Sequence, residues 1–128
     1  GTDVLIGVSG PGTISKDMVA SMSERAIVFA MANPIPEIMP DLARSAGAVV
    51  VATGRSDFPN QINNVLAFPG IFRAVIKGRL TTITHQMKEA AVKALASQVP
   101  TPTPDHIVPD LFHPHLAETI SEAILKAK

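Results

Sequence analysis

The sequence predicts an α/β fold in which about three parallel strands, with their helices, form the second half of a doubly wound sheet. Short β-branched runs alternate with helical periodicities along the chain. The run Ala26–Ala32 is continuously apolar, as expected of a strand buried on both faces. No glycine-rich phosphate turn precedes the first run. The half of the sheet that carries such a turn is therefore expected to belong to a larger polypeptide or to a partner.

The predicted strands are Val4–Val8, Ala26–Ala32 and Ala48–Ala52. The first strand ends in a turn from Ser9 to Gly12. The second ends at Asn33-Pro34, because proline cannot extend a ladder. The first strand would normally lie beside the other half of the sheet, so we expect its unpaired edge to be covered by further protein.

Two short helices are predicted between the strands. Thr13 or Ser15 caps the first, and Pro40 and Gly47 bracket the second. Met18, Val19 and Met22 lie on one side of the first helix, which is predicted to face the core, and the second helix holds Leu42, Ala43 and Ala46.

Helical patterns dominate the second half of the chain. The helical pattern that begins at Asn64 requires a kink or a new start at Pro69. Thr84 opens a second helix, which is expected to pack on the sheet. Pro114 lies near the start of the last helix. The apolar stripes are Met87, Ala91, Ala94 and Leu95, then Leu116, Ile120, Ala123 and Ile124. The predicted segments of a single partial domain, 1–128, are three βα units (1–62), helices (63–99), an extended proline-rich strap (100–113) and a carboxyl-terminal helix (114–128).

Composition excludes several classes of function. Eleven basic and eleven acidic residues give no net charge, and five phenylalanines are the only aromatic residues, so nucleic acid and anionic lipid are not expected partners. With no cysteine, disulfides and thiolate metal sites are impossible. The longest apolar run is far below the roughly 20 residues of a membrane helix, and no signal peptide is visible. We expect a soluble, cytoplasmic protein.

The loop after the third strand is the most informative segment. It holds four amides and two opposite charges, Asn60, Gln61, Asn63, Asn64, Arg55 and Asp57. Open α/β sheets bind ligands at the carboxyl ends of their strands, so the loop predicts recognition. Amides orient a carboxylate or carboxamide without adding charge, and the predicted helix after Asn64 would favour an anion at its amino-terminal end.

Simpler interpretations exist for each of these residues. Adjacent asparagines before a helix are usually caps, and asparagine before proline is usually a turn residue. Arg55 and Asp57 are expected to pair with each other, and no chemistry is assigned to them. His113 and His115 have no third ligand at a suitable spacing and are expected in a surface loop.

Four segments together carry a family resemblance: Asp3–Gly12, Val28–Glu37, Thr53–Asn64 and Ile107–Phe112. In their order and spacing they closely resemble malic enzymes of the smaller, prokaryote-like type. The resemblance covers essentially the whole chain and corresponds to the carboxyl-terminal part of the Rossmann-like NAD(P)-binding domain.

The resemblance implies oxidative decarboxylation of malate to pyruvate and CO2 with NAD or NADP and a magnesium or manganese ion. It implies cofactor contacts at Ser9, Gly10, Asn33 and Asn63 and substrate contacts at Asn63 and Asn64. The catalytic tyrosine and lysine, the metal ligands and the phosphate turn of the family match no residue of this chain, which is therefore expected to be inactive alone. The remaining polypeptide, and a second copy in a homo-oligomer, are the expected partners.

Two alternatives stay open from the sequence. The chain could be a non-catalytic binding or assembly module that docks a partner through its exposed sheet edge. It could instead belong to a dehydrogenase for an amino acid or one-carbon substrate, which the Asn63-Asn64 pair argues against. The residue that selects NAD or NADP lies near the ribose on an earlier strand, so the sequence leaves this choice open.

Overall fold

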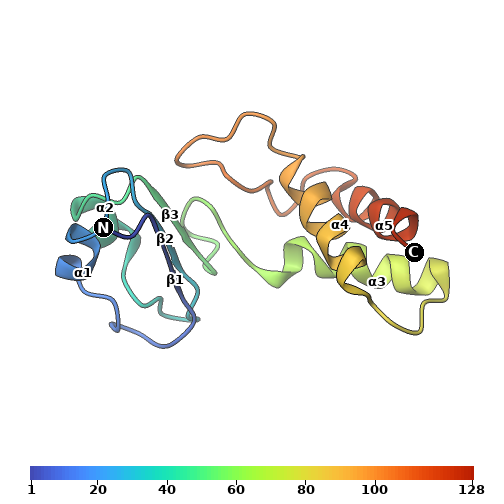
Figure 1. Ribbon diagram of the computed structural model, residues 1–128, viewed down its shortest axis with the longest axis horizontal. Coiled ribbons are helices and arrows are strands. Elements are labelled where there is room, and N and C mark those ends of the chain that lie inside the picture. Colours follow the sequence, from blue (N-terminus) through green and yellow to red (C-terminus); the bar gives the residue numbers. More distant parts are fainter. The chain divides into compact units, whose positions relative to one another are not determined.

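The computed structural model describes all residues, 1–128, and divides into two compact units. The first unit comprises residues 1–63 and 103–106, and the second comprises residues 64–102 and 107–128. The elements in chain order are β1 (Val4–Gly7), α1 (Lys16–Ala20), β2 (Ile27–Ala30), α2 (Pro40–Ser45), β3 (Val50–Thr53), the 3₁₀ helix η1 (Asn64–Leu66), α3 (Phe68–Gly78), α4 (His85–Ala96) and α5 (Leu116–Lys126) (Figure 1).

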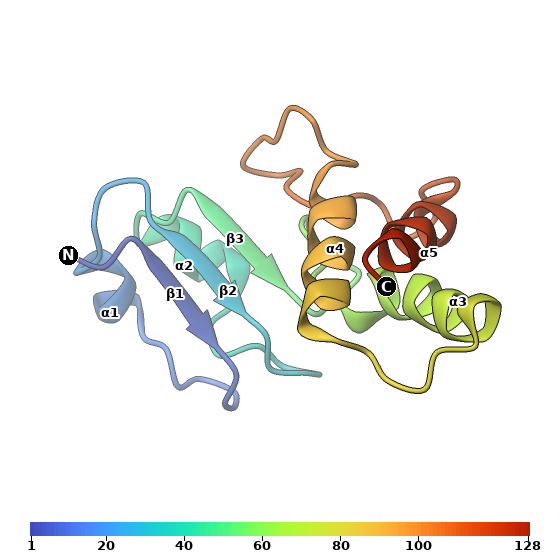
Figure 2. The ribbon, with the colours of Figure 1, turned by 45° about the vertical axis from the view of Figure 1, so that its right-hand side comes forward.

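The first unit is a three-stranded parallel sheet in the order β1-β2-β3, and the predicted α/β class is confirmed. Both crossover helices, α1 and α2, cover the same face of the sheet (Figures 1 and 2). This placement follows from the strand order, because successive right-handed crossovers in one direction put their helices on one side. The observed strands lie within two residues of the predicted boundaries.

The core of the first unit lies between the sheet and its two helices. It is formed by Ile14, Val19, Val28, Ala30, Ile38, Ala43, Ala48 and Val51, with Leu5, Met22 and Ala46 packed against it. Ser15 caps α1 by accepting a hydrogen bond from the Met18 N–H at 3.2 Å. The prediction that Met18 faces the core is wrong, because its side chain is 54% exposed. With only five residues, α1 presents little more than Val19 to the sheet.

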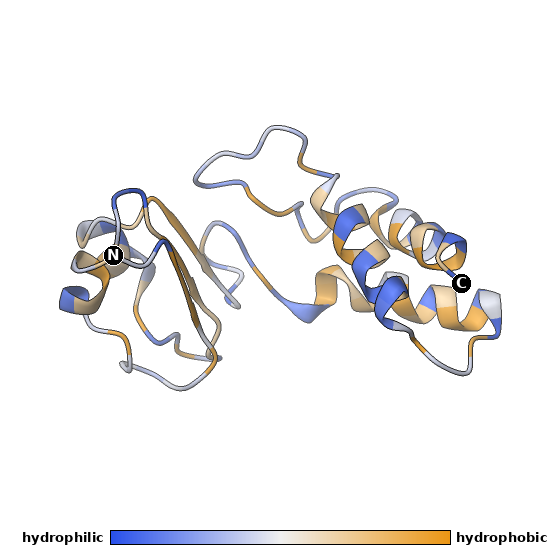
Figure 3. Ribbon diagram, in the orientation of Figure 1, coloured by the Kyte–Doolittle hydropathy of each residue, from blue (hydrophilic) through white to orange (hydrophobic).

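β1 lies at an edge of the sheet and leaves apolar surface uncovered. It pairs in the sheet with β2 alone. Val4 and Ile6 are 45% and 61% exposed, and they alternate along the strand with Leu5, which packs against the core, so they lie on the opposite face of the sheet. Figure 3 shows that apolar residues nonetheless run along all three strands. This combination of an unpaired edge and an apolar open face agrees with the expectation that further protein covers β1.

The second unit is helical and has its own core. Its buried residues are Leu66, Ala74, Met87, Ala91, Ala94, Leu116, Ile120 and Ile124. Pro69 lies in the first turn of α3 and starts a new helix, which is one of the two predicted outcomes, and Thr84 caps α4 as predicted. The expectation that α4 packs on the sheet is wrong, because its apolar stripe packs in this second core, beside α5. Periodicity identified the apolar face but could not identify its partner.

None of the helices has the length and apolar character that are needed to cross a membrane, and the longest has 12 residues.

α3 packs closely against α5 at Gly70. A β-carbon at this position would lie 2.6 Å from the Ile120 β-carbon and 3.0 Å from the Ala117 carbonyl oxygen. Gly70 is buried, and Ile120 is fully buried at the same contact. The absence of a side chain at residue 70 therefore allows the two helices to pack this closely.

We predict that Gly70→Ala lowers the free energy of unfolding by about 1–3 kcal/mol through overpacking against Ile120. Urea unfolding followed by circular dichroism measures the effect. Gly10→Ala is the matched control, since a β-carbon there would meet no atom within 4 Å. Equal stability of the two variants would contradict the prediction.

Candidate functional site

The carboxyl ends of the three strands meet at one edge of the sheet. The strands are aligned in register, so that Gly7, Ala30 and Thr53 are neighbours at this edge. The Met31 N–H donates to the Gly7 carbonyl oxygen at 3.0 Å, and the Ile62 N–H donates to the Thr53 carbonyl oxygen at 2.7 Å. The segments that follow the strands are therefore held side by side.

Four of the five predicted site residues lie at this edge. Ser9 and Gly10 follow β1, Asn33 follows β2, and Asn63 ends the loop after β3. The Asn63 side-chain amide donates to the Gly54 carbonyl oxygen at 3.4 Å, and a β-carbon at Gly54 would lie 3.9 Å from the Met31 carbonyl oxygen. The loop that carries Asn63 thus borders the turn that carries Asn33.

Asn64, the fifth predicted site residue, begins η1 and is the first residue of the second unit. η1 has three residues, and α3 begins only at Phe68. The expected contribution of a helix dipole at Asn64 is therefore wrong, because a single 3₁₀ turn aligns too few peptide groups. Any anion held here depends on the side-chain amide, which is exposed.

Sequence reasoning missed Glu37, the fully buried carboxylate of this edge. Its Oε1 accepts hydrogen bonds from the Ser9 N–H at 2.7 Å and from the Ser9 hydroxyl at 3.4 Å. Its Oε2 accepts from the Ala32 N–H at 3.0 Å. A signal for it does exist in the sequence, because Glu37 is the single charge in the otherwise apolar run from Ile35 to Met39.

The hydrogen bonds keep Glu37 ionised. Burial alone would raise the pKa of the Glu37 carboxyl, but the main-chain N–H groups of Ala32 and Ser9 donate to the charged form. The balance leaves the pKa of Glu37 below its ordinary value of 4.5. Since the folded pKa is depressed, the carboxylate stabilises the fold above the unfolded pKa, and this stabilisation is lost as the pH falls through the folded pKa.

We predict that Glu37→Gln lowers the free energy of unfolding at pH 7 by about 1.5–3 kcal/mol. The glutamine NH2 group would replace one carboxylate oxygen and so place a donor against a main-chain N–H donor. The difference between parent and variant should shrink as the pH falls below about 4.5, where the unfolded carboxyl begins to be protonated. Urea unfolding at a series of pH values measures it. The exposed Glu24→Gln is the control, and a difference that does not vary with pH would count against the assignment.

Arg55 and Asp57 pair with each other, as predicted. The Arg55 Nε and Nη2 groups donate to the two Asp57 carboxylate oxygens at 2.8 and 2.6 Å. The pairing raises the pKa of Arg55 and lowers the pKa of Asp57. Arg55 Nη1 also donates to the Pro34 carbonyl oxygen at 3.4 Å, which adds a polar link between the loop after β3 and the turn after β2.

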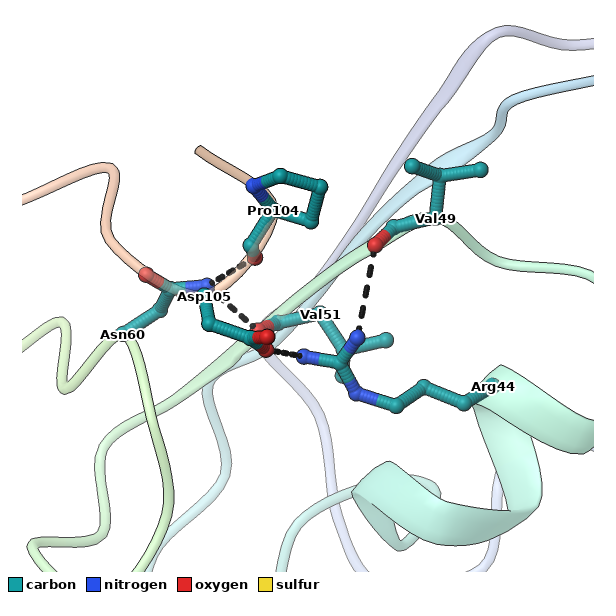
Figure 4. A network of polar contacts seen from close by, with 6 residues as sticks. All are labelled: Arg44, Val49, Val51, Asn60, Pro104 and Asp105. Carbon is teal, nitrogen blue, oxygen red and sulfur yellow. Dashed lines mark hydrogen bonds and ion pairs between the residues drawn. The ribbon is translucent and has the colours of Figure 1, made fainter. Parts of the chain in front are cut away.

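Asn60, one of the four loop amides, is buried and performs a structural task. Its backbone is left-handed, with φ of 58°, and its Nδ2 donates to the carbonyl oxygens of Val51 at 3.1 Å and Pro104 at 2.7 Å (Figure 4). Arg44 forms an ion pair with Asp105 in the same network. Within the segment expected to be an extended strap, residues 103–106 thus form a tight turn that is attached to the sheet.

Replacing the Asn60 donor should release this turn. We predict that Asn60→Asp lowers the free energy of unfolding by about 1–3 kcal/mol, because a carboxylate would face two carbonyl oxygens. Hydrogen exchange at the Thr103 and His106 amides should accelerate, since these two groups close the turn. Gln86→Glu, an exposed amide-to-acid change on α4, is the control. Unchanged exchange at both amides would refute the prediction.

Two histidines of the second unit, His113 and His115, lie around a hollow of roughly 330 Å³, which Arg73 and Glu118 also help to line. Glu118 accepts from Arg73 at 3.0 Å and lies 3.3 Å from His115 Nδ1. The chain contains no group of three or more His, Asp or Glu side chains that could hold a metal ion. The acidic ligands that a magnesium or manganese ion prefers are therefore not assembled by these residues.

The sequence profile described as "Malic enzyme, NAD binding domain" matches residues 1–127. The chain belongs to this malic enzyme family. A bifunctional malic/malolactic enzyme of Bacillus subtilis is 55% identical over 127 residues, which are 98% of this chain and 31% of that relative. An NAD-dependent malic enzyme of Geobacillus stearothermophilus is 50% identical over 132 residues, covering 99% of this chain and 27% of that relative. The chain thus spans about a third or less of these curated relatives' length.

Solved malic enzyme structures share the fold. The malic enzyme from Pyrococcus horikoshii aligns with a TM-score of 0.89 and 49% identity over 97% of this chain and 29% of that chain. The Entamoeba histolytica malic enzyme aligns with a TM-score of 0.92 and 42% identity over 97% of this chain and 26% of that chain. The predicted family and the Rossmann-like α/β class are therefore confirmed.

The donor set at the carboxyl edge fits a nicotinamide cofactor. Asn33 is exposed and Asn63 is partly exposed, and each side-chain amide has both a donor and an acceptor group, which are the complements of a carboxamide. A β-carbon at Gly10 would meet no atom within 4 Å, so a flat ligand group could approach the main chain there.

Proposed function

We propose that this chain is the part of an NAD(P)-dependent malic enzyme that holds the nicotinamide and malate. The enzyme oxidatively decarboxylates malate to pyruvate and CO2, and this chain supplies cofactor and substrate contacts to a catalytic centre completed by other residues. The observation that carries the proposal is the placement of Asn33 and Asn63 after adjacent strands of a malic enzyme NAD-binding domain. Open α/β sheets bind ligands at this edge.

Each amide has a distinct proposed role. Asn33, with Ser9 and Gly10, borders the nicotinamide end of the cofactor. Asn63 reaches both nicotinamide and malate, while Asn64 hydrogen-bonds malate. When bound, the cofactor accepts the hydride, and the residues of this chain bind and orient the reactants.

Further elements of the proposal lie outside the 128 residues. NAD and NADP both remain candidates, because the relatives include NAD-dependent and NADP-dependent malic enzymes. The magnesium or manganese ion would be held by other residues of the enzyme. A homo-oligomer and a cytoplasmic location complete the proposed setting.

Removing the amides of Asn63 and Asn64 should damage turnover. In a full-length malic enzyme that contains this chain, we predict that Asn63→Ala or Asn64→Ala lowers kcat/KM for malate by about 10- to 100-fold, as expected for a lost hydrogen bond to a charged group. The absorbance of the reduced NAD or NADP measures the rate. Gln86→Ala removes an exposed amide on α4 and should leave the rate unchanged.

The isolated 128-residue chain should reduce neither NAD nor NADP in the presence of malate. Turnover by the pure chain would refute the division of labour proposed here, and full activity of both asparagine variants would refute their roles.

A further inference from the structure

We propose that Glu37 is a positioning residue for the nicotinamide cofactor, because its buried carboxylate holds together the two turns that present Ser9 and Asn33. The inference rests on the proposed function and adds to it a residue without direct cofactor contact. Glu37 acts through the groups to which it is hydrogen-bonded, and it therefore determines the positions of Ser9 and Asn33.

The two carboxylate oxygens divide between two strand ends. Oε1 binds the turn after β1, through the Ser9 N–H at 2.7 Å and the Ser9 hydroxyl at 3.4 Å. Oε2 binds the segment after β2, through the Ala32 N–H at 3.0 Å. Ala32 directly precedes Asn33, so one rigid group fixes one predicted cofactor contact and the neighbour of another.

The surrounding fold is shaped to admit this carboxylate. A β-carbon at Gly7 would lie 2.8 Å from the Glu37 carboxyl carbon and 3.0 Å from its Oε1, so only glycine leaves room for it. The Glu37 carbonyl oxygen also accepts from the Ile14 N–H at 3.3 Å. Both the main chain and the side chain of Glu37 are therefore held in place.

The hydrogen-bond network around Glu37 continues from Ser9 into the turn after β1. The Ser9 and Thr13 hydroxyl oxygens lie 2.8 Å apart, and the Thr13 hydroxyl donates to the Gly10 carbonyl oxygen at 2.8 Å. Glu37, Ser9, Thr13 and Gly10 thus form one connected polar chain. Displacing the carboxylate would shift Ser9 and Gly10, which are both predicted cofactor contacts.

A carboxylate is required because every group that faces it is a donor. Glutamine is nearly isosteric, but its NH2 group would oppose one of the two N–H groups. The hydrogen bonds offset the cost of burying the charge, and each of the two carboxylate oxygens serves a different strand end. Besides stabilising the fold, these two acceptors of fixed separation set the spacing of the two turns.

The test compares Glu37→Gln with Glu24→Gln, an exposed carboxylate of the same unit, in the full-length malic enzyme that contains this chain. We expect Glu37→Gln to raise the KM for NAD or NADP about 10-fold or more, as for a displaced site, while kcat at saturating cofactor changes less than about 3-fold. Gly7→Ala, which keeps the charge but displaces the carboxylate, should raise the same KM. A merely stabilising residue would leave the cofactor KM of the folded enzyme unchanged, and that result would overturn the proposal.

A measurement on the parent enzyme covers the case in which the variants do not fold. Hydrogen exchange at the Ser9 and Ala32 amides should be slow, and cofactor should slow it further at both turns together. Fast exchange, or protection of neither turn by cofactor, would overturn the proposal. If the parent enzyme itself shows no malate-dependent reduction of NAD or NADP, the proposed function fails. If it does, and Glu37→Gln keeps the parent's cofactor KM, only the present inference fails.

Discussion

The alignment of the three parallel strands is the constraint on which the rest of the first unit depends. Because Gly7, Ala30 and Thr53 are neighbours across the sheet, every segment that leaves a strand begins at the same edge. The chain then has little freedom in where it places the residues that follow. Polar side chains that are more than 20 residues apart in the sequence are thereby brought to one edge of the sheet.

The three loops at this edge are stabilised by side chains that are not themselves predicted to contact the cofactor or the substrate. Glu37 connects the first two strand ends, Arg55 connects the third loop to the second through Pro34, and Asn60 attaches the third loop to β3. Each uses side-chain groups to satisfy main-chain donors or acceptors that would otherwise be left without partners near the sheet. The amides that remain exposed, Asn33 above all, are thereby available for ligands.

The sequence allowed the strands, most helix starts and the family to be predicted, because these depend on local patterns. Ser15, Pro40 and Thr84 marked helix starts through capping and backbone preferences that act over a few residues. Met18 was misplaced because α1 is too short for a periodicity to define its buried side. The partner of α4 was misplaced because an apolar stripe is compatible with any apolar surface.

The roles of Glu37 and Asn60 could not be predicted for a different reason. Their partners are main-chain groups, which every residue possesses and no side-chain pattern reveals. Asn60 binds Pro104 across 44 positions, and Arg44 meets Asp105 across 61. The boundary between the two units, which falls between Asn63 and Asn64, could not be predicted either, because it lies inside one continuous sequence motif.

The attachment of residues 103–106 to the sheet has a consequence for the order in which the chain folds during synthesis. The first unit is not continuous in sequence, since α3 and α4 are inserted before its last four residues. During synthesis, the sheet and its helices emerge from the ribosome well before the Thr103–His106 turn that attaches to them. The sheet unit can therefore reach its final form only after most of the helical unit has been translated, and cutting the polypeptide after Asn63 would never yield it whole.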